Sequence, residues 1–384
     1  MNRNYEISAT YEQLLQRIST ALLLNANFSS DRSLSLGKMG SAVFLYHYSE
    51  YRDEQILFDF ANELLLETIT DLKGNNIDYT VGLTGIGAAI RYLSARDFVD
   101  ISDQNTIFTE IDFRVEKKSL HVDLHRDSVG VTRYLLEKID PIETEEIQDI
   151  NLLLQLERII LHIEHVGKSA KIPDPISHLN MRRIIGEKKD LINLINLSED
   201  MYLAVGLLNA TLNKGICKKI ASDYREVLLA KNNENLVQLY ATLKDYSIEK
   251  DWVVCLNLLI KTYYISYSSG IQNILANEDF PAMILNMVKD CKDADFSILG
   301  VSLHTETISL LQHINMSLKK GPLEEAIDTY ISYLILNIGD DIIEAAYQPQ
   351  IKNIGLDGIS GLAMAILSRL DYRRADWHEL SLAF

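Results

Sequence analysis

The amino-acid sequence predicts an all-α protein, and two observations support this fold class. The first is that apolar residues recur every three or four positions, which is the spacing of an amphipathic helix. The second is a glycine-rich segment that recurs along the chain. A clear helical stripe is formed by the residues Leu323, Ala326, Ile327, Tyr330, Ile331 and Leu334. The alternating pattern of a half-buried strand is hard to find in the sequence.

The glycine-rich segments, called glycine turns below, indicate a repeated structural unit. Four such segments occur, at residues 37–44, 82–90, 127–131 and 355–363. The spacing from Gly40 to Gly85 is 45 residues, and the spacing from Gly85 to Gly130 is again 45. A period of 20–50 residues is typical of repeat architectures.

Each repeat is expected to be a pair of helices. Glycine permits a tight turn and a close backbone approach, so one helix of each pair can lie deep in the fold. The amphipathic helix that follows then covers it. Repetition produces either an open solenoid or a closed ring, and the apolar tail Leu380–Phe384, which lacks a polar cap, favours the ring. No segment reads as a linker, so a single domain over residues 1–384 is predicted.

Composition limits the classes of function. The 384 residues are 47% hydrophobic and carry a net charge of −17, which disfavours binding to nucleic acid. The three cysteines, Cys217, Cys255 and Cys291, form no CxxC pair, so a reducing compartment is expected. Neither a signal peptide nor an apolar run of about 20 residues is evident, and we expect a soluble, cytoplasmic protein without a transmembrane segment.

The glycine turns, at this period, resemble those of the lanthionine synthetase C-like (LanC-like) family. Residues 355–367 look like the last inner helix of that family, and Asp376–Leu382 looks like its closing segment, which contains a tryptophan. The resemblance runs from about Leu36 to the end of the chain and is weak between residues 140 and 300. It implies an (α/α) toroid of seven inner and seven outer helices.

The resemblance also implies a chemistry. Family members that act as cyclases bind zinc in the central cavity and take a peptide whose Ser and Thr residues have been dehydrated. They add a cysteine thiol of that peptide across the new double bond, which forms a thioether ring, as in lantibiotic biosynthesis. Zinc supplies the thiolate nucleophile, because a free thiol with a pKa near ~8.5 is mostly protonated.

All three family zinc ligands differ in this sequence. The family has a cysteine directly after a tryptophan in the fifth repeat, where this chain has Val253. The Cys-His pair of the sixth repeat corresponds to Leu299 and Gly300. We therefore expect a zinc-free, degenerate cyclase, or pseudoenzyme, without a cofactor. Its expected partner is a precursor peptide or a peptide-modifying enzyme.

Two alternatives remain open. Cys255 and His304 lie two and four positions beyond the aligned ligand positions and could rebuild a zinc site, which would make the chain an active cyclase. In the competing interpretation, Cys255 is a buried apolar group and His304 a hydrogen-bonded core histidine. Alternatively, the toroid could be a carbohydrate enzyme with paired carboxylates, which we expect among Asp123, Asp127, Glu199 and Asp357.

The expected acid and cavity residues follow from the same alignment. Asp123 lies seven residues before Gly130, where the family often has an aspartate, and is the candidate general acid. Glu199 occupies the position of a family histidine. The residues expected at the turns and at the cavity are Gly40, Gly85, Asp127, Gly130, Glu199, Asp357 and Gly358.

Overall fold

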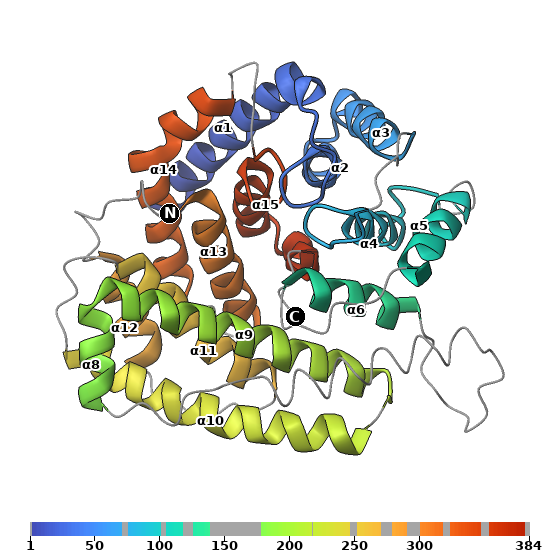
Figure 1. Ribbon diagram of the computed structural model, residues 1–384. Coiled ribbons are helices and arrows are strands. Elements are labelled where there is room, and N and C mark those ends of the chain that lie inside the picture. Colours follow the sequence, from blue (N-terminus) through green and yellow to red (C-terminus); the bar gives the residue numbers. More distant parts are fainter. Residues whose placement is uncertain are drawn as a thin grey trace. The chain divides into compact units, whose positions relative to one another are not determined.

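A computed structural model describes most of the chain, and every regular element in the described ranges is a helix (Figure 1). This confirms the predicted all-α class. The described residues are 2–70, 76–100, 105–117, 126–138, 178–216, 218–245, 252–269, 279–289, 300–317, 323–346 and 353–380.

The chain divides into two compact units. The terminal unit comprises Met1–Lys118, Phe296–Met316 and Glu324–Ala383, and the middle unit comprises Ser119–Asp295, Ser317–Leu323 and Phe384. The helices of the terminal unit are α1 (Asn2–Asn25), the 3-10 helix η1 (Ala26–Phe28), α2 (Lys38–Arg52), α3 (Gln55–Thr70), α4 (Leu83–Ser94), α5 (Asn105–Lys117), α13 (Gly300–Ser317), α14 (Glu324–Ala346), α15 (Ile359–Leu370) and the 3-10 helix η4 (Tyr372–Glu379). The helices of the middle unit are α6 (Arg126–Lys138), α8 (His178–Gly186), α9 (Lys188–Asn213), α10 (Lys218–Asp245), α11 (Trp252–Ser268) and α12 (Asp279–Lys289).

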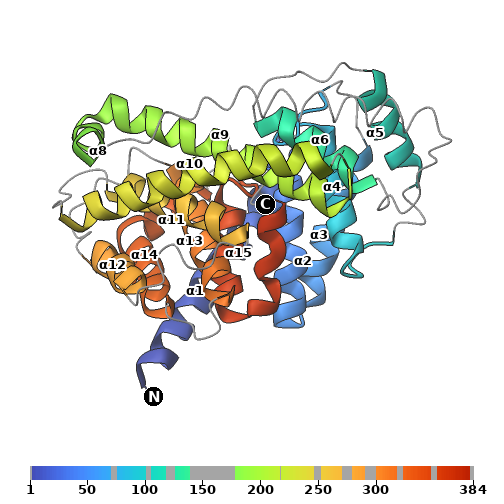
Figure 2. The ribbon, with the colours of Figure 1, turned by 90° about the horizontal axis from the view of Figure 1, so that it is seen from below.

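In the terminal unit, fully buried helices alternate with covering helices. Every residue of α2 from Lys38 to Ser49 is buried, and so is every residue of α15 from Ile359 to Ser368. The next helix in sequence after α2, α3, buries only one face. Figures 1 and 2 show α2 and α3 side by side, while α15 contacts both α2 and α1. This alternation agrees with the helix pairs expected from the sequence.

The outer helix α14 follows the predicted stripe. All six residues of the stripe are at most 4% exposed, and α14 packs against α1 as well as α15. The helical spacing therefore identified both the helix and its buried face.

The residues just before the first glycine turn are hydrogen-bonded to the start of the last one. Leu356 N donates to Leu34 O at 3.1 Å, and Ile354 N donates to Leu36 O at 3.0 Å. A Cβ atom placed on Gly40 would lie 2.3 Å from Leu34 O and 2.5 Å from Leu356 N. Only glycine fits there, because any side chain would collide with the backbone of both turns.

The second glycine turn joins the same cluster, since Ser35 N donates to Thr80 O at 3.0 Å. The hydroxyl of Ser41 reaches the last turn as well and donates to Ile354 O at 3.0 Å, across 313 positions of the sequence. Three of the four glycine turns are therefore neighbours in one unit.

The middle unit is built around the long helix α9, which contacts α6, α8, α10 and α11. Figures 1 and 2 both show α9 running alongside α10. Within α9, residues Lys189–Asn213 are long and apolar enough to cross a membrane, although 56% of that window is buried inside the protein. The sequence had suggested no run of this length. Core helices of soluble proteins meet the same criterion, so the run alone does not indicate a membrane protein.

The arrangement of seven inner and seven outer helices in a closed toroid stays a prediction, as does the single domain over residues 1–384. The two compact units are each helical, which both predictions require.

Candidate functional site

The glycine turns lie at the starts of helices, as the repeat model expects. Gly40 is the third residue of α2 and Gly85 is the third residue of α4. Gly358 directly precedes α15, and Asp357 lies in the turn before it. The fourth turn falls in α6, where Asp127 and Gly130 occupy the second and fifth positions, and Gly130 is buried.

Glu199 does not lie at a turn, which corrects the sequence-based expectation. It is the twelfth residue of α9, a helix of 26 residues. The reason is local: the segment from Lys188 to Glu199 contains neither glycine nor proline, so nothing interrupts the helix there. The helix that contains Glu199 begins at Lys188, 11 residues before it.

The aligned zinc positions lie at helix starts but offer no ligand atom. Val253 is the second residue of α11 and is 3% exposed, with only a hydrocarbon side chain. Gly300 is the first residue of α13 and has no side chain at all. Leu299 lies outside the described residues, as do Asp123, Cys217 and Cys291.

The alternative ligand His304 is engaged inside the terminal unit. It is the fifth residue of α13 and is 2% exposed, and its Nδ1 lies 2.8 Å from the hydroxyl of Tyr330 on α14. Burial lowers the pKa of His304 to about 4, so the ring is neutral at pH 7. This environment matches the interpretation of a hydrogen-bonded core histidine.

The alternative ligand Cys255 is a fully buried thiol in α11 of the middle unit. Cys255 and His304 belong to different compact units, as do Val253 and Gly300, so this division does not distinguish the rebuilt site from the aligned one. In the part of the chain that the structure describes, no three residues among His, Cys, Asp and Glu are grouped as a metal site would require.

The position of the family histidine is occupied by a buried ion pair. Glu199 on α9 forms a salt bridge with Lys261 on α11, and the side chain of Lys261 is 4% exposed. The ammonium group of Lys261 also lies 5.4 Å from the ring centroid of Tyr202, which is a cation–π distance. Glu199 is therefore the partner of a buried cation. Sequence reasoning missed this pair, although Lys261 is the one charged residue in the apolar helix Trp252–Ser268.

A second polar cluster holds the C-terminal segment against the terminal unit. The guanidinium group of Arg374 can only donate, so His47 Nδ1, 3.4 Å away, is the acceptor. His47 Nε2–H then donates to the hydroxyl of Tyr92 at 2.9 Å, and Tyr92 donates to Asp376 Oδ1 at 3.2 Å. Burial, followed by the positive charges of Arg374 and Arg96, lowers the pKa of His47 to about 3.

This cluster fixes the segment that resembles the family's closing segment. Trp377 is fully buried, and Arg96 forms a salt bridge with its neighbour Asp376. The tryptophan predicted to close the fold is thus a core residue of the terminal unit. No sequence pattern points to His47, because a single histidine within a helix has no diagnostic spacing.

The three described carboxylates among those proposed for a carbohydrate enzyme are divided between the two units. Asp127 and Glu199 belong to the middle unit, whereas Asp357 belongs to the terminal unit. Glu199 is occupied by Lys261. Paired acid and base catalysis needs two of these groups facing one sugar, and this pairing stays a prediction.

In comparisons with known proteins, no protein-family model matches the chain, and no curated protein matches it.

Proposed function

We propose that the chain is a LanC-like protein of lanthipeptide-type peptide modification that binds a precursor peptide or a partner enzyme and holds no zinc. The observation that supports this most is the hydrogen bonding between residues 34–36, just before the first glycine turn, and residues 354–356, at the start of the last one. A ring of helix pairs needs its first and last repeats to be neighbours. An open solenoid would keep them apart.

The absence of cyclase activity is proposed from the donor set. Addition of a thiol to a dehydrated residue needs a thiolate, and the family generates it with zinc. At the aligned positions Val253 and Gly300 supply no donor, and the nearby His304 is bonded to Tyr330. A peptide cysteine would therefore stay protonated in this cavity at neutral pH.

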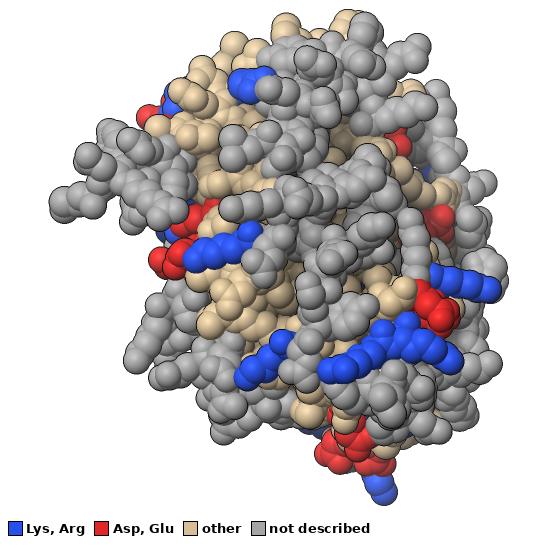
Figure 3. Space-filling model, turned by 90° about the vertical axis from the view of Figure 1, so that its left-hand side faces the viewer, with Lys and Arg blue, Asp and Glu red and all other residues tan. Residues whose placement is uncertain are grey.

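The proposed partner and location follow from charge. A net charge of −17 favours a basic or neutral peptide over nucleic acid, and the sparse cysteines fit the cytoplasm. On the face shown in Figure 3, the described acidic and basic side chains are interspersed.

Restoration of the zinc ligands is the sharpest test. The triple variant Val253→Cys, Leu299→Cys and Gly300→His should bind about one zinc ion per chain, because three thiolate and imidazole ligands suffice for a catalytic-type site. The native chain should bind none. Zinc is measured by inductively coupled plasma mass spectrometry after dialysis against a weak chelator.

The matched control places the same ligands one residue later, as Val254→Cys, Gly300→Cys and Val301→His. A shift of one residue rotates each side chain by about 100° around its helix, so this variant should bind no zinc. Stoichiometric zinc in the native chain would contradict the proposal. Equal zinc content in the restored and shifted variants would show that zinc binding does not depend on the aligned positions, which would contradict the resemblance at this site.

Peptide binding is tested with a synthetic, fluorescently labelled peptide that contains one dehydroalanine and one cysteine. Fluorescence anisotropy should show saturable binding, and the free thiol content of the peptide, titrated with a disulfide reagent, should stay constant on incubation. Loss of the thiol would show that the chain closes thioether rings, which would favour the rebuilt cyclase.

A further inference from the structure

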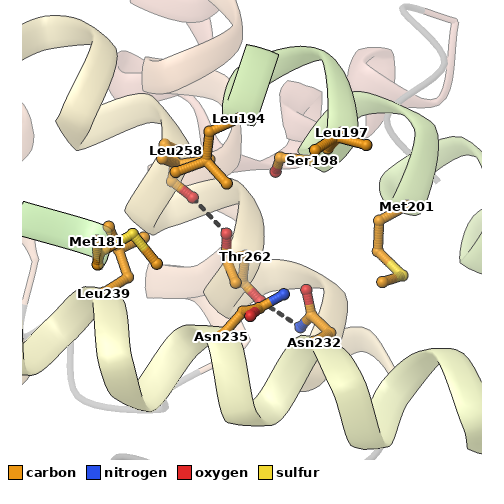
Figure 4. A pocket seen from close by; sticks show the side chains of 10 residues that line it. All are labelled: Met181, Leu194, Leu197, Ser198, Met201, Asn232, Asn235, Leu239, Leu258 and Thr262. Atoms are coloured by element: carbon orange, nitrogen blue, oxygen red, sulfur yellow. Dashed lines mark hydrogen bonds between the residues drawn. The ribbon is translucent and has the colours of Figure 1, made fainter. Parts of the chain in front are cut away.

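The middle unit contains a pocket that no part of the proposed function uses. It lies among α8, α9, α10 and α11 and has a volume of about 400 Å³, including its open mouth (Figure 4). Because this volume includes space open to solvent, the pocket suits a ligand of only a few non-hydrogen atoms. Its lining residues are Met181, Leu194, Leu197, Ser198, Met201, Asn232, Asn235, Leu239, Leu258 and Thr262.

The lining is suited to an uncharged ligand with an apolar part. Six of its residues are leucine or methionine, and none of the lining residues that the structure describes is charged. A charged group entering the pocket would lose its hydration without gaining a counter-ion, which is costly. Leucine and methionine side chains contact short alkyl groups well, and methionine adapts its shape to them.

One polar group in the pocket is unsatisfied. Ser198 is 9% exposed, and its Oγ is buried without a hydrogen-bond partner in the part of the chain that the structure describes. In Figure 4 the oxygen of Ser198 points from α9 into the space above α10. A buried hydroxyl without a partner is unfavourable, and a ligand atom that bonds to it would remove this cost.

A second polar group faces the same space from the opposite side. Asn232 donates its Nδ2 hydrogens to Thr262 O at 2.9 Å and to Ser266 Oγ at 2.7 Å. These bonds fix the amide plane, and Figure 4 shows its oxygen turned away from Thr262, toward the pocket. The pocket thus presents a carbonyl acceptor from α10 and a hydroxyl from α9.

From this arrangement we propose that the pocket binds a small neutral group that combines a short alkyl chain with one hydroxyl or carboxamide. The alkyl part lies among the leucine and methionine side chains. The polar end accepts a hydrogen bond from Ser198 and donates one to Asn232. This proposal does not depend on whether the aligned positions bind zinc, because neither Val253 nor Gly300 lines the pocket.

Isobutyramide is the probe, and isobutyrate is its matched, charged control. The chain has 8 methionines, two of which, Met181 and Met201, line the pocket. With methyl-labelled methionine, isobutyramide should shift these two NMR signals in a saturable manner, with a Kd on the order of 1–10 mM for so small a ligand. Isobutyrate should bind at least about tenfold more weakly. Met181→Leu and Met201→Leu assign the two signals with little change of volume.

Ser198→Ala should weaken isobutyramide binding by about fivefold, since one hydrogen bond is lost. Ser309→Ala, at a buried serine outside the pocket, should leave binding unchanged. The proposal is overturned if the two methionine signals do not respond, if isobutyrate binds as well as isobutyramide, or if Ser198→Ala binds like the native chain.

The capped peptide Ac-Gly-Gln-Gly-NH2 distinguishes two sources of a carboxamide. Tighter binding of the peptide than of isobutyramide assigns the pocket to a side chain presented by a peptide. Tighter binding of isobutyramide assigns it to a free small molecule. Either result supports the site, whereas the absence of a response to both probes contradicts it.

Discussion

Both compact units link neighbouring helices through polar side chains, as His47–Tyr92 and Glu199–Lys261 do, but the terminal unit adds direct backbone contacts. In the terminal unit, glycine turns let backbone atoms meet directly, as at Gly40. In the middle unit, long helices of 26 and 28 residues are linked through polar side chains. The pair Glu199–Lys261 joins α9 to α11, and Asn232 joins α10 to α11.

The difference explains where a family resemblance can be recognised. A backbone contact needs glycine at a fixed position, so it leaves a motif in the sequence. A contact between side chains can be made by many residue types at several positions. Glycine motifs are accordingly frequent in the terminal unit and are not found between residues 140 and 300, which are mostly in the middle unit.

The largest effect is expected at a glycine turn. Gly40→Ala should lower the free energy of unfolding by about 4 kcal/mol, because the new Cβ would collide with the backbone of two turns that cannot move independently. Urea unfolding followed by circular dichroism measures this. Val237→Ala, at an exposed position on α10, is the control and should change the value by at most ~0.5 kcal/mol. A cost below about 1 kcal/mol for Gly40→Ala would refute the proposed role of the backbone contact.

In the middle unit, the two halves of the ion pair should respond unequally. Glu199→Gln leaves the buried ammonium of Lys261 without its counter-ion and should cost about 3 kcal/mol. Lys261→Met removes the buried charge, and Glu199, whose side chain is 30% exposed, can be hydrated, so the cost should be about 1 kcal/mol. The same urea titrations at pH 7 provide both numbers. Equal costs would mean that burial of Lys261 is not what makes the pair sensitive.

The terminal unit should have a distinct pH dependence through His47. Its folded pKa, about 3, is below the ordinary value of 6.5, so the unfolded chain takes up this proton first as the pH falls. The native chain should therefore lose stability relative to His47→Gln by about 1.4 kcal/mol per pH unit between pH 6 and 4. Above pH 7 the free energies of unfolding of the native chain and of His47→Gln should depend on pH in the same way. Parallel curves at all pH values would show that His47 takes up its proton equally well in the folded chain.

The smallest effect is expected at Ser198. Ser198→Ala removes a buried hydroxyl without a partner, so the free energy of unfolding should stay constant or rise by up to ~1 kcal/mol. Thr211→Val in the same helix removes a hydroxyl that donates to Leu207 O, and it should instead cost up to ~1 kcal/mol. A loss of stability in Ser198→Ala comparable to that in Thr211→Val would show that the hydroxyl already has a partner.

The sequence predicted the helical class, the helix pairs and the positions of three glycine turns, because periodicity and glycine spacing are local properties of the chain. It also located the starts of α11 and α13, near Val253 and Gly300. It placed Glu199 at a turn, because an alignment by residue type carries no information about helix length. The ion pair with Lys261, the bond from His304 to Tyr330 and the pocket at Ser198 depend on tertiary contacts that no local pattern encodes.

The contact between Ser41 and Ile354, 313 positions apart, has a consequence for synthesis in the cell. The first helix pair emerges from the ribosome long before the last turn exists, so its buried face lacks one neighbour for most of translation. Contacts of such long sequence separation form slowly, and apolar surfaces that stay exposed until these contacts form are prone to aggregation. The nascent chain should therefore depend on chaperones until its final turn is released.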